Sequence, residues 1–94
     1  MGIITKPFDV AEHLETNSDI LEFLEEALST GSASDFIHAL NTAARARGMN
    51  DIAKQAGVTR ATLYRSLSAD GNPRFEMIKK VIGTFGGELA IVNH

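Results

Sequence analysis

The chain has no cysteine, no tryptophan and a single tyrosine. The absence of cysteine excludes disulfide frameworks, thiolate zinc sites and cysteine nucleophiles. No apolar run approaches the ~18 residues that a membrane span requires, and no basic segment precedes an apolar stretch, as it does in a signal peptide. We therefore expect the 94 residues to form one small cytoplasmic globular domain without a membrane segment.

Signatures of catalysis and of metal binding are also missing. The histidines His13, His38 and His94 lie far apart and lack the i, i+4 spacing of paired metal ligands. There is no Gly-x-Ser-x-Gly nucleophile elbow and no phosphate-binding glycine loop. The carboxylates of the first forty residues alternate with apolar positions, as on a solvated helix face. We expect no enzyme, no cofactor and no metal site.

Charge, in contrast, is unevenly distributed. Residues 1–40 contain eight acidic side chains and one lysine, a net charge of −7. Residues 41–94 contain eight basic and four acidic side chains, a net charge of +4. Such asymmetry between halves is typical of a chain with two different partners, although complementary helices within one fold produce it as well.

Apolar periodicity predicts an all-α fold, a five- to six-helix bundle followed by a short strand. The first expected helix extends from the cap Asp9 to about Leu14, the second from the cap Asn17 or Ser18 to an end at Thr30–Ser32, and the third from the cap Ser34 to near Gly48. The others are 51–56 capped by Asn50, 60–67 capped by Thr59, and 74–85; the expected strand is 88–92. The expected inward faces are Ile20, Leu21, Phe23, Leu24, Ala27 and Leu28 in the second helix, and Phe75, Ile78, Ile82 and Phe85 in the last.

Residues 49–67 have the form of a helix-turn-helix of the phage repressor type. Ala53 is the small residue where two steeply crossing helices touch, and Gly57 follows at the turn, where φ > 0 is required. Val58 plugs the corner between the helices. The position three residues after Leu63 is Ser66 and not an aliphatic residue, so Leu67 is expected to fill that space.

An outward polar surface remains on this motif, and it suits base edges and phosphates. The candidate DNA-binding residues are Asn50, Lys54, Thr59, Arg60, Ala61, Thr62, Tyr64, Arg65 and Arg74. Those from Thr59 to Arg65 are expected at the major groove, and Asn50, Lys54 and Arg74 at phosphates.

The chain resembles the addiction-module antidote (antitoxin) family, whose helix-turn-helix is of the phage Cro/repressor type and whose partners are RelE-like (HigB-type) toxins. The matching stretches are TKPFDVAEHL at 5–14, AARARGM at 43–49, GVTRATLYRSLS at 57–68 and GNPRF at 71–75. The resemblance implies a homodimer that represses its own operon and neutralises the toxin by direct contact.

Under this resemblance, residues 1–94 form one antitoxin domain in which 1–40 is the candidate toxin-binding part and 41–87 the DNA-binding part. RelE-like toxins act on ribosomal and messenger RNA, so the resemblance implies a basic working surface. The exposed carboxylates Glu22, Glu25 and Glu26 are the candidate toxin contacts.

The tail, 88–92, is the candidate dimerisation segment, with Leu89, Ile91 and Val92 as its contact residues. A five-residue strand needs a partner for its backbone groups. Two pairings are open, one with the same segment of a second copy and one with residues 3–5 of its own chain.

Two other functions remain open at this stage. A stand-alone phage-type repressor would bind operator DNA but no toxin. An adaptor would bind the toxin but hardly any DNA.

Overall fold

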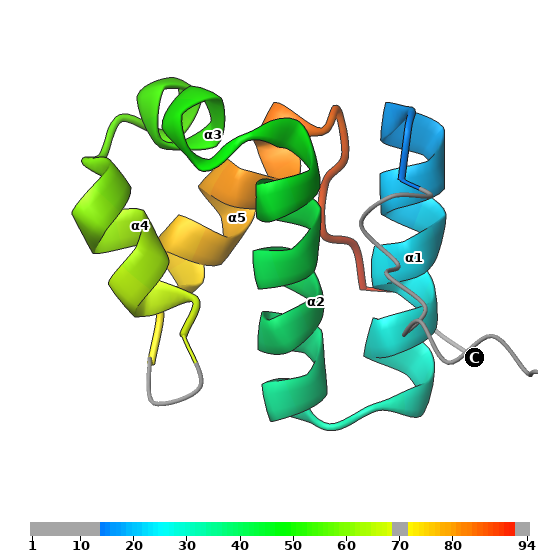
Figure 1. Ribbon diagram of the computed structural model, residues 1–94. Coiled ribbons are helices and arrows are strands. Elements are labelled where there is room, and N and C mark those ends of the chain that lie inside the picture. The colour runs from blue at the N-terminus through cyan, green and yellow to red at the C-terminus, as the bar shows by residue number, and fades with distance from the viewer. Residues whose placement is uncertain (1–13, 69–71, 92–94) are drawn as a thin grey trace, which may run out of the picture.

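The computed structural model describes residues 14–68 and 72–91, and these form five α-helices (Figure 1). The helices are α1 (Asn17–Thr30), α2 (Ala33–Arg47), α3 (Met49–Ala56), α4 (Arg60–Ser66) and α5 (Phe75–Thr84). The all-helical prediction is confirmed for this part of the chain. The short helix predicted over 9–14 lies outside the described residues apart from Leu14, which is buried. No helix in the described ranges is long and apolar enough to cross a membrane.

Helices α1 and α2 run antiparallel side by side, joined by a short turn (Figure 1). Each begins with a capping box: Asp19 N–H donates to Thr16 Oγ1 over 3.0 Å, and Asp35 N–H to Ser32 Oγ over 3.2 Å. The carboxylate of each aspartate accepts the N–H of its cap residue in return. The predicted caps Asn17, Ser18 and Ser34 are therefore wrong, because only Thr16 and Ser32 have an aspartate three residues later.

One core joins all five helices, with Leu63 contributed by α4, and it extends to Phe85 directly after α5. Its buried apolar residues include Ile20 and Leu24 of α1, Phe36, Leu40 and Ala43 of α2, Ile52 of α3, Val81 and Ile82 of α5, and Phe85. Two predicted core residues lie elsewhere: Leu28 is 54% exposed and Phe75 is 63% exposed. Leu28 is in the last turn of α1 and Phe75 is the first residue of α5, and the Lys79 ammonium lies 5.9 Å from the Phe75 ring centroid.

Helix α3 follows α2 almost without a break and leads into α4 through a tight turn. Gly48, at φ 106°, turns the chain directly into α3, so the predicted cap Asn50 lies inside the first turn and is exposed. Gly57 has the left-handed conformation expected there, φ 75° and ψ 29°, and Val58 N–H donates to Ala53 O over 3.0 Å. Helix α4 lies beyond this turn, away from α1 (Figure 1).

The predicted strand at 88–92 is wrong for residues 88–91, which are neither helix nor strand, and Val92 lies outside the described residues. After α5, Gly86 has φ 80° and turns the chain back between α1 and α2 (Figure 1). Gly87 passes so close to α1 that an added Cβ would lie 2.5 Å from Leu21 Cδ2. Leu89 packs against the core, and this apolar contact takes the place of the expected backbone pairing.

Candidate nucleic-acid interface

Helix α4 has one face in the core and one in solvent. Leu63 is 0% exposed and Leu67, directly after the helix, is 2% exposed, so Leu67 fills the space next to half-buried Ser66 as predicted. The predicted DNA-binding side chains Thr59, Arg60, Ala61, Tyr64 and Arg65 are all exposed, Tyr64 by 59%. The buried leucines pack this short helix against the core, and its other face presents the guanidinium groups of Arg60 and Arg65 and the phenol of Tyr64 to solvent.

The start of α4 is fixed by its predicted cap. Thr59 Oγ1 accepts the backbone N–H of Thr62 over 3.1 Å, and the two threonine hydroxyl oxygens lie 2.8 Å apart. Both hydroxyls therefore already have a partner within the helix, and Thr62 is half-buried. The cap fixes the N-terminal end of α4, from which Arg60 projects.

Two hollows flank α4, and they divide the predicted polar residues between them. Asn50 and Arg60 line one of about 510 Å³, between α2, α3 and α4. Thr62 and Arg74 line another of about 360 Å³, between α4 and α5. Lys54 is exposed on α3 and lines neither. Four of the predicted residues are thus divided between two hollows and do not share one continuous pocket.

Two cations of these hollows are absent from the predicted set. Arg45 of α2 lines the first hollow, and Lys80 of α5 lines the second, where its Nζ lies 3.3 Å from Glu76 Oε1. In the sequence, Arg45 stands out only as a cation in the last turn of a helix, where it complements the helix dipole. The periodicity of apolar residues describes the faces of a single helix and not the position of one helix relative to another. The sequence therefore did not indicate that Arg45 lies near α4.

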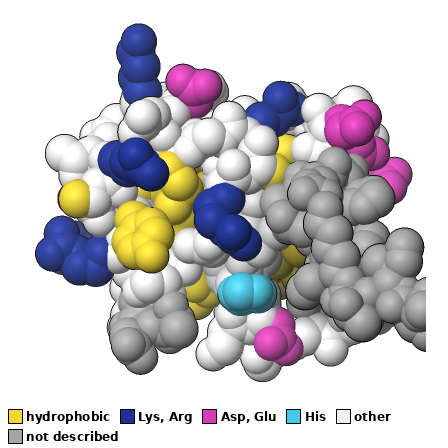
Figure 2. Space-filling model, in the orientation of Figure 1, with side chains coloured by type: hydrophobic (Ala, Val, Ile, Leu, Met, Phe, Trp, Pro, Cys, Tyr) yellow, Lys and Arg dark blue, Asp and Glu magenta, His cyan; other side chains and the backbone are white. Residues whose placement is uncertain are grey.

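The acidic side chains of α1 are separated from this region, whereas Asp51 lines the first hollow and Glu76 lines the second. In the view of Figure 2, Lys and Arg side chains surround exposed hydrophobic surface on the side of α4, and several acidic side chains gather on the side of α1. Glu22, Glu25 and Glu26 of α1 are all exposed. Among the residues that the structure describes, no three His, Asp or Glu side chains form a group that could hold a metal ion.

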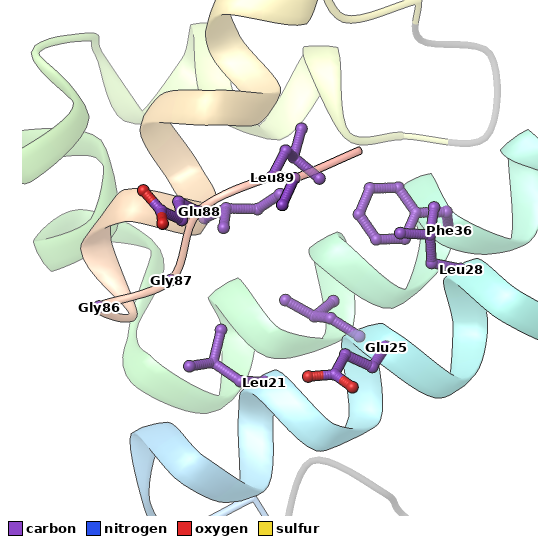
Figure 3. Close-up of a pocket in the computed structure, with 11 residues that line it drawn as sticks. Leu21, Glu25, Leu28, Phe36, Gly86, Gly87, Glu88 and Leu89 are labelled. Carbon is purple, nitrogen blue, oxygen red and sulfur yellow. The ribbon is translucent and has the colours of Figure 1, made fainter. Parts of the chain in front are cut away.

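An apolar groove of about 520 Å³ lies beside these carboxylates (Figure 3). Leu21 and Leu28 of α1 and Phe36 of α2 form one side, and Leu89 and its neighbours in the segment after α5 form the other. Glu25 also lines the groove, whereas Glu22 and Glu26 do not. The predicted dimerisation residue Leu89 thus contacts its own chain, while Ile91 is fully exposed.

Comparison of the sequence with known proteins identifies a family that this chain matches. A family model described as "Probable addiction module antidote protein" matches residues 4–93. An uncharacterized protein of Haemophilus influenzae is 44% identical over 77 residues, which cover 82% of this chain and 79% of that protein. No solved structure matches the chain significantly.

Proposed function

This chain belongs to the probable addiction module antidote protein family, and from that membership we propose that it is the antitoxin of a type II toxin–antitoxin system. In this proposal it binds its own operator through a helix-turn-helix formed by α3 and α4, represses its operon, and neutralises a RelE-like toxin by direct contact. The observation that carries the DNA-binding part is the division of α4 between buried leucines and exposed Arg60, Tyr64 and Arg65.

In the proposed complex, α4 enters the major groove with its N-terminal residues toward base edges. Arg60 and Arg65 are the base readers, because a guanidinium offers two parallel donors to guanine. Asn50, Lys54 and Arg74 contact phosphates on either side, and Thr59 and Thr62 face the major groove. Tyr64 and Ala61 supply the apolar contacts with thymine methyl groups.

We propose a homodimer, since one α4 offers too little surface for a specific operator. Two copies of α4 about 34 Å apart would match successive turns of the DNA major groove on a palindromic site. Ile91, which is fully exposed in the single chain, is the proposed contact with the second copy.

The DNA proposal is tested by titrating the protein with its own promoter fragment and with an unrelated duplex of equal length. Arg60→Ala and Arg65→Ala should each lower operator affinity by about 1–3 kcal/mol and leave binding of the unrelated duplex nearly unchanged. Lys54→Ala should weaken both duplexes alike and reduce the salt slope by about one. Parent-like operator affinity in both arginine variants would rule out α4 as the reading helix.

For the toxin, we propose docking on the acidic side of the molecule, over α1 and the apolar groove. Glu22, Glu25 and Glu26 attract the basic partner over a distance, which mostly raises the association rate. The groove then takes an apolar side chain of the toxin against Leu28 and Phe36, and this burial supplies most of the affinity. The 54% exposure of Leu28 makes it the apolar anchor that a partner can cover.

The two roles are separable by kinetics with the toxin encoded in the same operon. Reversing Glu22, Glu25 and Glu26 to Lys should slow association and weaken its salt dependence, with dissociation little changed. Leu28→Ala should leave the association rate unchanged and speed up dissociation by about tenfold. An unchanged association rate of the triple variant at low salt would leave the acidic side without a partner.

The same measurements discriminate the two other functions. A protein that binds operator DNA but not the toxin would be a stand-alone repressor. A protein that binds the toxin but no DNA, at any salt concentration, would be an adaptor.

A further inference from the structure

The hollow beside α4 contains an arginine from outside the helix-turn-helix. Arg45 is in the last turn of α2, and it lines the same hollow of about 510 Å³ as Arg60 of α4 and the first turn of α3. Both arginines are exposed. Three helices thus meet where two guanidinium groups face solvent.

The Arg45 guanidinium is held in place by a hydrogen-bonded chain that ends on α4. Arg45 Nε donates to Asn41 Oδ1 over 3.1 Å, and Asn41 Nδ2 donates to Leu67 O over 3.2 Å. Leu67 is the C-cap residue of α4, and Asn41 is half-buried between the helices. One amide side chain therefore fixes Arg45 relative to α4, while the two Nη groups, with four of the five N–H donors, are not used in this bond.

Arg47, two residues further along α2, has a different orientation. Its Nη2 donates to Asn17 Oδ1 at the start of α1, so it links the first two helices. Within residues 14–68 and 72–91, the salt bridge shorter than 4.0 Å joins Lys80 to Glu76. In these ranges, therefore, neither Arg45 nor Arg60 forms a salt bridge with a carboxylate. Asp51 lines the hollow as well, which leaves it with two positive charges and one negative.

We propose that Arg45 binds a phosphate of the DNA backbone beside α4, and that Asn41 is its positioning residue. The inference rests on the proposed DNA binding and adds a contact from the helix before the motif. A guanidinium already fixed at Nε presents its Nη donors to a phosphate with little loss of side-chain entropy. Through Asn41, the phosphate contact and the reading helix move as one unit.

The test measures binding of the promoter fragment and of an unrelated duplex over a range of salt concentrations. Arg45→Ala should weaken both duplexes by about tenfold and lower the salt slope by about one. Arg47→Ala is the matched control, since it removes the same charge from the same helix and should leave the slope unchanged. Asp51→Asn should strengthen binding of both duplexes, because it removes the negative charge of the hollow.

The role of Asn41 is tested by a double-mutant cycle. Asn41→Ala should weaken binding less than Arg45→Ala does, and it should have no further effect once Arg45 is alanine. Thermal unfolding of the four proteins shows whether loss of the bond to Leu67 destabilises α4. Equal, additive losses in the cycle would mean that Asn41 supports α4 alone and does not position Arg45.

The remaining outcomes separate this inference from the function on which it rests. Equal effects of Arg45→Ala and Arg47→Ala would show that only net charge matters, and would refute the phosphate contact. Parent-like binding by Arg45→Ala, together with weak binding by Arg60→Ala, would refute it while the proposed function stands. A parent protein that binds neither duplex would refute both.

Discussion

The left-handed turn between α3 and α4 leads to a prediction that compares two glycines. Gly57 has φ 75° and Gly83 lies within α5, and an added Cβ would meet nothing within 4 Å at either position. Replacement by alanine therefore introduces no clash in either case. Both replacements reduce the conformational entropy of the unfolded chain equally, which by itself stabilises by ~0.4–1 kcal/mol.

The two variants differ in backbone conformation, which is left-handed at position 57 and α-helical at position 83. At Gly57 an alanine must adopt the left-handed conformation, which costs about 1–2 kcal/mol. We therefore expect Gly83→Ala to be more stable than the parent and Gly57→Ala less stable, with about 1–2 kcal/mol between the two variants.

The assay is urea unfolding followed by far-UV circular dichroism, at one protein concentration, because the stability of the proposed dimer would depend on that concentration. Thermal unfolding should separate the variants by roughly 4–8 °C for each kcal/mol in a domain of this size. Two variants of equal stability would refute the left-handed assignment of Gly57, and with it the geometry that orients α4.

Further predictions concern the cap, the core and the tail. Thr59→Ala removes the acceptor of an N-terminal N–H of α4 and should cost about 1 kcal/mol in unfolding free energy, while Thr59→Ser should retain most of it. Leu63→Ala, at a side chain with 0% exposure, should cost about 2–5 kcal/mol in the same measurement. Ile91→Asp should give a monomer by light scattering at parent-like melting temperature, whereas Leu89→Ala should lower the melting temperature and leave the dimer intact. Deletion of 88–94 should combine both losses, and an unchanged dimer after this deletion would place the interface elsewhere.

Local rules in the sequence were sufficient for most of the elements. Apolar spacing of 3.6 residues predicted the helices. Gly57 predicted the turn and Thr59 the cap, because the conformation at each position depends on residues only a few places away in the sequence. The errors at the caps of α1 and α2 were also local. Thr16 and Ser32 each have an aspartate three residues later, the pattern of a capping box, whereas Asn17, Ser18 and Ser34 do not.

The structure of the tail could not be predicted from local sequence patterns. An apolar, β-favouring run at 88–92 predicts a strand equally well whether or not a partner strand exists, and in the structure Leu89 packs against the core instead. The exposure of Leu28 and Phe75 was missed for a similar reason, since periodicity identifies a helix face but not which positions of that face another helix covers.

The sequence by itself determined the helices, the turn at Gly57, the outward residues of α4 and the separation of acidic from basic halves, because each depends on neighbours along the chain. Only the tertiary structure decided that Arg45 and Arg60 line the same hollow, that Asn41 links α2 to the end of α4, and that Glu25 borders an apolar groove. These are contacts between side chains whose distance is set by how helices cross and pack. The crossing of two helices is a property of the whole core, and no pattern within either helix contains it.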